Sequence, residues 1–118
     1  MATLRVLVVE DDDATRELLQ LALGERGYET VSALDGQHAL RLALVSQPDV
    51  IVLDLGLPIM SGVEFVANWR QTIGDDGVPL VVISARSDIK AVARDLRARA
   101  AFAKPFDVDA LIAAVDAS

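Results

Sequence analysis

The sequence predicts an α/β fold in which a parallel five-stranded sheet is covered by helices on both faces. Two observations lead to this prediction. Short runs rich in Val, Ile and Leu alternate with longer stretches whose apolar residues recur at helical spacing. The composition is 53% hydrophobic but only 4% aromatic, and aliphatic side chains are typical of a parallel sheet buried on both faces.

Short apolar runs, many of them β-branched, mark four of the strands, and the strand expected at Glu29–Ala33 has a weaker pattern. The two clearest runs, Val-Ile-Val-Leu and Leu-Val-Val-Ile, contain no polar residue, which indicates strands buried on both faces. The first strand of the chain is interrupted only by Arg5. In chain order, strands are expected at Leu4–Val9, Glu29–Ala33, Val50–Leu53, Leu80–Ile83 and Ala101–Ala103.

The first two helices are predicted from local signals and from apolar spacing. Asp12 or Asp13 is expected to cap the first helix. Asp35-Gly36 is interpreted as a turn before the second helix, and Pro48 is expected to end that helix. The apolar positions that define the two helices are Ala14, Leu18, Leu21 and Ala22 for the first, and Ala39, Leu40 and Ala43 for the second.

The last three helices follow the same spacing. A loop with Pro58 and Gly62 precedes the third helix, and a turn-rich connection at Gly74–Pro79 follows it. The fourth helix is expected near Asp88–Arg99, and Asp107 is expected to cap the fifth. Their apolar positions are Phe65, Val66, Trp69 and Ile73, then Ile89, Val92, Ala93 and Leu96, then Val108, Leu111, Ile112 and Val115.

Composition and charge narrow the function classes. The 118 residues are expected to form a single domain over residues 1–118. The chain has no Cys, which excludes disulfides and thiolate chemistry. Its first residues lack the basic and apolar regions of a signal peptide, and no apolar run approaches about 20 residues. A cytoplasmic protein is therefore expected. The formal net charge of -7 argues against a broad nucleic-acid-binding surface.

Polar side chains follow four of the five predicted strands. In chain order they are Glu10 with Asp11, Asp54, Ser84 and Lys104. Ligands of open α/β sheets bind outside the carboxyl ends of the strands, so these side chains are expected to meet at one edge of the sheet.

The residue types at this edge predict metal-assisted phosphoryl transfer. Three carboxylates repel one another unless a cation lies between them, and Glu10, Asp11 and Asp54 offer the oxygen ligands that Mg²⁺ prefers. Asp54 is the candidate nucleophile, because an aspartate can form an acyl phosphate. Lys104 supplies a positive charge and Ser84 a hydroxyl donor for the phosphoryl oxygens.

Four segments together resemble the receiver domain of two-component response regulators. They are Val8-Val9-Glu10-Asp11-Asp12, Asp54-Leu55-Gly56-Leu57-Pro58-Ile59-Met60-Ser61-Gly62, Ser84-Ala85 and Lys104-Pro105-Phe106. They cover essentially the whole chain in the order and spacing of that family. The resemblance, which is to the chemotaxis regulator type, implies a doubly wound, flavodoxin-like (βα)₅ three-layer sandwich with strand order 2-1-3-4-5.

The resemblance also implies a role for each site residue. Asp54 would accept a phosphoryl group from a phosphohistidine, and Mg²⁺ would be bound by Glu10, Asp11, Asp54 and the backbone carbonyl of Gly56. Lys104 would contact the phosphoryl group, and its bond to the following proline would be cis. Ser84 would be the switch hydroxyl that moves toward the phosphoryl group.

The same resemblance implies the partners. The phosphoryl donor would be a sensor histidine kinase or a phosphotransfer protein. The output partner would contact the face made by the fourth helix, fifth strand and fifth helix, without direct binding to nucleic acid or a membrane. The chain would be a signalling domain and not an enzyme acting on a separate substrate. No output domain is expected within these 118 residues, so the chain is either a stand-alone receiver or one domain of a larger regulator.

Three positions depart from the family pattern. Ala101 stands where many relatives carry an aromatic switch residue, and strand alternation turns the neighbouring Phe102 to the opposite face. Movement of the loop after Ser84 is therefore expected to contribute more to switching than ring rotation. Gly56 leaves the acceptor open to hydrolytic water, whereas Arg86 either covers it or pairs with the phosphoryl group.

Other functions are less well supported by the residues. An aspartyl-phosphate phosphatase would need an acid/base Asp at Gly56, and a flavin carrier would need a Gly/Ser/Thr-rich loop in place of the acidic run after the first strand. The alternative is a degenerate receiver that acts through protein contacts without phosphorylation, because Ala101 replaces the usual aromatic switch residue. His38 is expected at the surface. A basic cluster is either a solvated face or a partner surface: Lys90, Arg94, Arg97 and Arg99.

Overall fold

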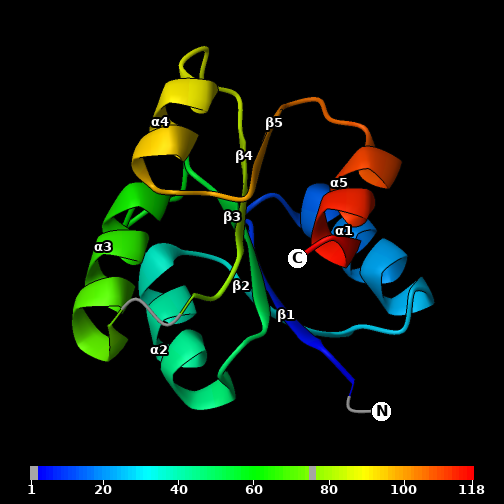
Figure 1. The fold of residues 1–118 in the computed structure, drawn as a ribbon, viewed down its shortest axis with the longest axis horizontal. Coiled ribbons are helices and arrows are strands. Elements are labelled where there is room, and N and C mark those ends of the chain that lie inside the picture. The colour runs from blue at the N-terminus through cyan, green and yellow to red at the C-terminus, as the bar shows by residue number, and fades with distance from the viewer. Residues whose placement is uncertain (1–2, 75–76) are drawn as a thin grey trace.

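The computed structural model describes residues 3–74 and 77–118, and within them five parallel strands form one sheet in the order β2-β1-β3-β4-β5. Strands and helices alternate along the chain as the sequence predicts (Figure 1). The elements are β1 Arg5–Val9, α1 Asp13–Glu25, β2 Glu29–Ala33, α2 Gly36–Ser46, β3 Val50–Asp54, α3 Gly62–Ile73, β4 Leu80–Ser84, α4 Ile89–Asp95, β5 Ala100–Ala103 and α5 Val108–Asp116.

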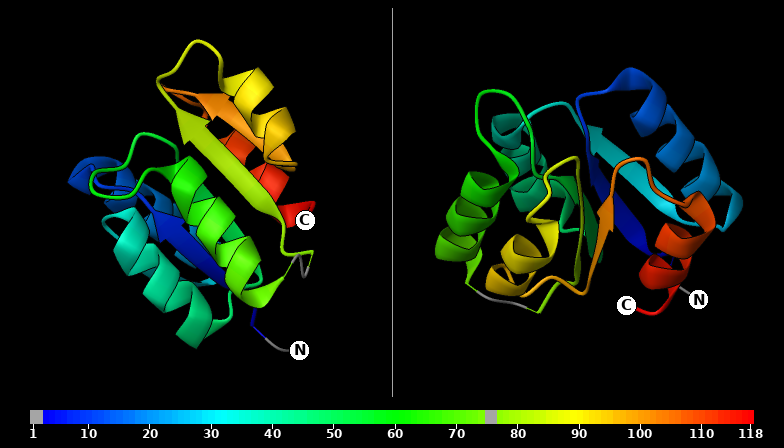
Figure 2. Two further views of the ribbon diagram at one scale, coloured as in Figure 1. Left: turned by 90° about the vertical axis from the view of Figure 1, so that its left-hand side faces the viewer. Right: turned by 90° about the horizontal axis from the view of Figure 1, so that it is seen from above.

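The helices cover the sheet from both sides. Helices α1 and α5 lie on one face and α2, α3 and α4 on the other (Figures 1 and 2). Side chains alternate along β1 accordingly: Val6 and Val8 pack toward α1 and α5, whereas Leu7 and Val9 pack toward the other three helices. The sheet therefore separates two aliphatic cores, and the predicted three-layer architecture is confirmed.

The strands expected to be buried occupy the middle of the sheet. Every residue of β3 and of β4 is buried. Phe65 and Trp69 are also fully or almost fully buried, with stacked rings whose centroids lie 6.3 Å apart, as predicted for core residues. Part of the turn-rich connection expected at Gly74–Pro79 lies outside the described residues.

Helix α1 buries a different face from the one predicted. Leu18 and Leu21 are 46% and 64% exposed, whereas Leu19 and Leu23 are completely buried. Leu18 and Leu21 form one set at helical spacing with Ala22, and Leu19 and Leu23 form another with the same alanine. Periodicity alone therefore does not show which set faces the sheet. The structure turns Leu19 and Leu23 toward the sheet and leaves an apolar strip on the outside of α1.

Two further boundaries differ from the prediction. Asp35-Gly36 begins α2 and is not a separate turn: Asp35 is the N-cap, and its carboxylate accepts the His38 N–H at 2.8 Å. Helix α4 is shorter than expected, because the chain turns into a left-handed conformation at Arg97, with φ of 57°. No helix of the described residues has the length and apolar character needed to cross a membrane.

Candidate functional site

The polar residues that follow the strands meet at one edge of the sheet, as predicted. Asp54 and Ser84 are the last residues of β3 and β4, and Glu10 and Lys104 directly follow β1 and β5. The right-hand view of Figure 2 looks from above, onto the edge where these strands end. An open pocket at this edge is lined by Asp11, Asp54, Gly56, Ser84, Ala85, Arg86 and Lys104.

Three carboxylates form a tight group at this edge of the sheet. Glu10 is completely buried, Asp54 is 5% exposed and Asp11 is exposed. One oxygen from each lies within 4.8 Å of the other two. Lys104 partly balances this charge, since its Nζ lies 2.7 Å from Glu10 Oε1 and 3.2 Å from Asp54 Oδ2.

The surroundings of these groups shift their proton affinities. Burial raises the pKa of Glu10 to about 7, and the neighbouring Asp54 carboxylate adds to the rise while Lys104 opposes it. Burial alone would lower the pKa of Lys104, but its hydrogen bond to Glu10 and the charge of Asp54 raise it overall. The lysine therefore stays protonated. Its single positive charge is the counterpart of three carboxyl groups, so a further cation would be favoured at the site.

The acidic group fits a hard divalent cation. Glu10 Oε1 is buried, and among the described residues its partner is Lys104, whose Nζ lies 2.7 Å away. Carboxylate oxygens brought together in this way suit Mg²⁺, which also retains waters and binds phosphate oxygens. Gly56 lies beside the group, and its N–H donates to Asp54 Oδ1 at 3.1 Å.

Ser84 and Arg86 connect the pocket to the start of α4. Ser84 is 1% exposed, and its Oγ accepts the backbone N–H of Arg86 at 3.0 Å. The Arg86 guanidinium donates to both carboxylate oxygens of Asp88, from Nε to Oδ1 at 2.9 Å and from Nη2 to Oδ2 at 2.8 Å. This pair is not among the sequence predictions, although Arg86 and Asp88 are opposite charges two residues apart in one loop.

The loop after Asp54 is held by close backbone approaches. A Cβ at Gly62 would lie 2.7 Å from the Asp54 carbonyl oxygen, and one at Gly36 would lie 2.2 Å from the Met60 carbonyl oxygen. Within this loop Ile59 is 75% exposed and has φ of 66°, a conformation that β-branched residues rarely adopt. The loop that shapes the pocket is thus fixed by α2 and α3.

The structure also answers the expectations for β5. The Lys104–Pro105 bond is cis, as the resemblance implies. Ala101 packs with the core under α2, α3 and α4, while Phe102 packs with the α1 and α5 core, so the two residues do face opposite sides. Phe102 therefore does not replace the missing aromatic at Ala101.

Of the other residues singled out, His38 and the basic cluster lie apart from the pocket. His38 is partly exposed, and its Nδ1 accepts the Leu34 N–H at 3.5 Å. The basic residues are all exposed. Lys90 and Arg94 are on α4, whereas Arg97 and Arg99 follow it and line a separate pocket with Arg70.

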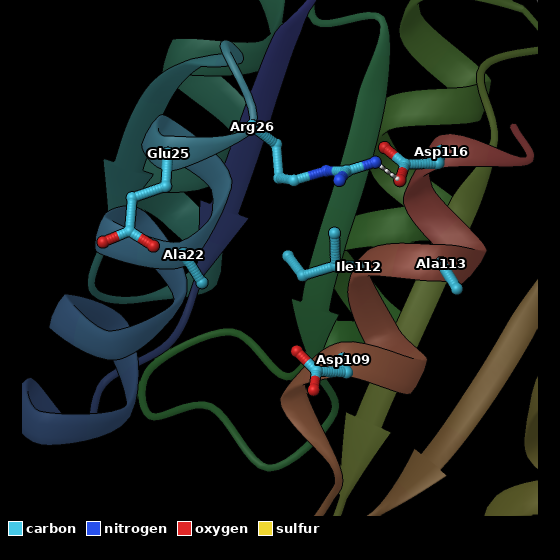
Figure 3. Close-up of a pocket in the computed structure, with 7 residues that line it drawn as sticks. All are labelled: Ala22, Glu25, Arg26, Asp109, Ile112, Ala113 and Asp116. Atoms are coloured by element: carbon cyan, nitrogen blue, oxygen red, sulfur yellow. Dashed lines mark hydrogen bonds and ion pairs between the residues drawn. The ribbon is translucent and has the colours of Figure 1, made fainter.

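A further pocket lies between α1 and α5. Figure 3 shows Arg26 and Asp116 facing each other across it, and the Nη2 to Oδ2 distance is 2.6 Å. The Tyr28 hydroxyl also donates to Asp116. These contacts lower the pKa of Asp116, with the tyrosine hydrogen bond as the main cause. They fasten the last turn of α5 to the end of α1, and the pocket shares no lining residue with the acidic site.

Comparison with known proteins identifies the family. The family model of the response regulator receiver domain matches residues 6–116. The chain belongs to this family. The receiver domain is 41% identical over 115 residues to the transcriptional regulatory protein PrrA of Mycobacterium tuberculosis. The aligned segment covers 96% of this chain and 48% of PrrA. It is 38% identical over 115 residues to the transcriptional regulatory protein KdpE of the same species, and the aligned segment covers 50% of KdpE.

Solved structures agree with this assignment. The chemotaxis protein CheY4 of Vibrio cholerae superposes with a TM-score of 0.88 and 29% identity over 98% of both chains. A response regulator receiver protein from Pseudomonas putida gives 0.88 with 27% identity, over 100% of this chain and 99% of the other. The chain spans about half the length of the curated relatives PrrA and KdpE. It is a signalling domain of two-component systems with a CheY-like fold.

Proposed function

We propose that this receiver domain is a phosphorylation-activated switch in which Asp54 accepts a phosphoryl group from a phosphohistidine with the help of Mg²⁺. The observation that carries the proposal is the position of Asp54, a nearly buried carboxylate between the ammonium of Lys104 and the carboxylates of Glu10 and Asp11. A buried nucleophile beside a fixed cation and a metal-binding group is what phosphoryl transfer requires.

The proposed transfer is a direct exchange of bonds. A carboxylate oxygen of Asp54 attacks the phosphorus, a P–O bond forms, and the P–N bond to the donor histidine breaks with its electron pair going to the imidazole nitrogen. Glu10, Asp11, Asp54 and the Gly56 carbonyl would hold Mg²⁺, which when bound would supply positive charge to the phosphoryl oxygens. Lys104 moves from its two carboxylates toward the phosphoryl group, and the Ser84 hydroxyl donates to it.

The donor is a sensor histidine kinase or a phosphotransfer protein. Its histidine must come within bonding distance of Asp54, so its surface must contact the rim of the pocket. One side of that rim is apolar: a groove beside Lys104 is lined by Leu18, Pro105 and Phe106. Exposed Leu18 on α1 thus has a role as a docking contact. ATP-dependent kinases supply such donors in the cytoplasm, which is the proposed location.

The output partner binds the face made by α4, β5 and α5 when the phosphorylated state becomes populated. The exposed cations Lys90 and Arg94 on α4 favour an acidic partner surface. Ala101 favours one alternative, a receiver that works through contacts alone, because the usual aromatic of the switch is missing. The intact set of Glu10, Asp54 and Lys104 favours the phosphorylated switch.

Intact-mass measurement tests the proposal. The protein is incubated with acetyl phosphate, with and without Mg²⁺, and Asp54→Ala is compared with the matched control Asp95→Ala, which removes an exposed carboxylate on α4. The expected result is a mass gain of one phosphoryl group that needs Mg²⁺ and Asp54 and survives in the control. If a phosphohistidine donor and acetyl phosphate both leave the mass unchanged, the contact-only function replaces the proposal.

A further inference from the structure

Helix α4 differs from the other helices in how it begins. The N-cap side chains of α1, α2, α3 and α5 each accept a hydrogen bond from their own first turn. Within the described residues, the N-cap of α4, Asp88, accepts none from its helix. Its backbone also differs, with ψ of 20°, whereas the other four N-caps have ψ between 117° and 171°.

The Asp88 carboxylate faces Arg86 and makes no hydrogen bond to the first turn of α4. Both of its oxygens accept hydrogen bonds from the Arg86 guanidinium, and this pair lowers the pKa of Asp88. Asp is among the best N-cap residues, so the pairing withholds a stabilising contact from the helix. Helix α4 spans only Ile89–Asp95, which makes its first turn a large part of it.

Arg86 also belongs to the wall of the acidic pocket. It lines the pocket together with Asp54 and Lys104, and its backbone N–H is bonded to the Ser84 hydroxyl. Its ion pair with Asp88 is easily exchanged, since both side chains are about half exposed, at 49% and 52%. A phosphoryl dianion accepts the same two-pronged contact from a guanidinium with more charge than a carboxylate has.

We infer that Arg86 is a phosphoryl-binding residue that exchanges Asp88 for the phosphoryl group on Asp54, and that the released Asp88 then caps α4. This inference rests on the proposed function and adds the route by which the site controls the helix. Capping requires Asp88 to adopt the extended backbone of the other N-caps, so the loop after Ser84 moves with it. The route involves no aromatic side chain and therefore operates with Ala101 in place.

Hydrogen exchange at the start of α4 measures the cap directly. The first N–H groups of a helix have no partner inside the helix, and an N-cap carboxylate bonds those of the second and third residues, here Lys90 and Ala91. Exchange is measured by NMR with Mg²⁺, with and without beryllofluoride as the phosphoryl mimic. Arg86→Gln frees Asp88, Asp88→Ala removes the cap, and Arg94→Gln is the control with the same charge change on α4.

The expected results separate the two proposals. In the unsubstituted protein, beryllofluoride slows exchange at Ala91 by about fivefold, the effect expected of one cap. Arg86→Gln shows slow exchange without beryllofluoride, Asp88→Ala shows fast exchange with and without it, and Arg94→Gln behaves as the unsubstituted protein. Fast exchange in Arg86→Gln without the mimic overturns the inference, whatever happens at Asp54.

Binding of the mimic is followed separately by ¹⁹F NMR. Bound beryllofluoride with unchanged exchange at Lys90 and Ala91 also overturns the inference and leaves the proposed function standing. If neither the mimic nor acetyl phosphate modifies the site, the proposed function fails. Slow exchange in Arg86→Gln then still supports the competition between Arg86 and the helix for Asp88.

Discussion

Replacing Gly36 with Ala would put a methyl group where the loop after Asp54 already lies. The new Cβ would be 2.2 Å from the Met60 carbonyl oxygen and 2.9 Å from its carbonyl carbon. Because the obstacle is backbone, no side-chain rotation relieves it, and α2 or the loop has to move. Forcing an extra group into a packed contact costs about 1–3 kcal/mol, and this geometry points to the upper end, about 3 kcal/mol.

Urea denaturation followed by the fluorescence of Trp69, the one tryptophan in the sequence, measures this loss. Gly24→Ala is the matched control: it lies in α1, a Cβ there meets nothing within 4 Å, and the change should stabilise the protein by about 0.5–1 kcal/mol. Both substitutions replace glycine with alanine, but they should change the free energy of unfolding in opposite directions. Equal free energies of unfolding for Gly36→Ala and the unsubstituted protein would refute the steric argument.

Three more predictions follow from the structure. Burial raises the pKa of Glu10 from 4.5 to about 7, so the folded metal-free protein retains a proton that the unfolded chain loses; its stability should fall as pH rises through this window, and Glu10→Gln should flatten that dependence in pH-resolved urea titrations. Ile59→Asn should raise the free energy of unfolding by about 0.5–1 kcal/mol, because asparagine tolerates the positive φ better; an unchanged midpoint would contradict the assignment of strain. Tyr28→Phe should cost about 1 kcal/mol by removing the hydroxyl that bonds Asp116, as measured by thermal unfolding, whereas Tyr28→Phe in an Asp116→Asn background should cost less.

The sequence predicts the sheet well because each strand is specified by its own residues. Val-Ile-Val-Leu and Leu-Val-Val-Ile have few alternatives to a strand buried on both faces. Once the strands are parallel, their carboxyl ends share an edge, so Asp54, Ser84 and Lys104 had to come together. The grouping of the candidate site thus follows from topology and needs no knowledge of side-chain conformation.

The errors occur where two local solutions have similar energies. On α1, Leu18 with Leu21 and Leu19 with Leu23 both match helical spacing, and packing against the sheet decides between them. Near Asp88, where the fourth helix is expected to begin, the carboxylate pairs with Arg86 and does not bond the first turn of the helix, and helical spacing does not predict this choice. Sequence patterns state what a residue can do, while the choice between partners depends on where neighbouring charges lie.

The sheet between the two cores has a consequence for how the domain tolerates change. Leu23 packs in the core under α1 and α5, and Val66 packs in the core under α2, α3 and α4. Substitutions at separated sites without shared partners have additive free energies, so truncating both residues should cost the sum of the single losses. Each layer can therefore accumulate substitutions without compensation in the other.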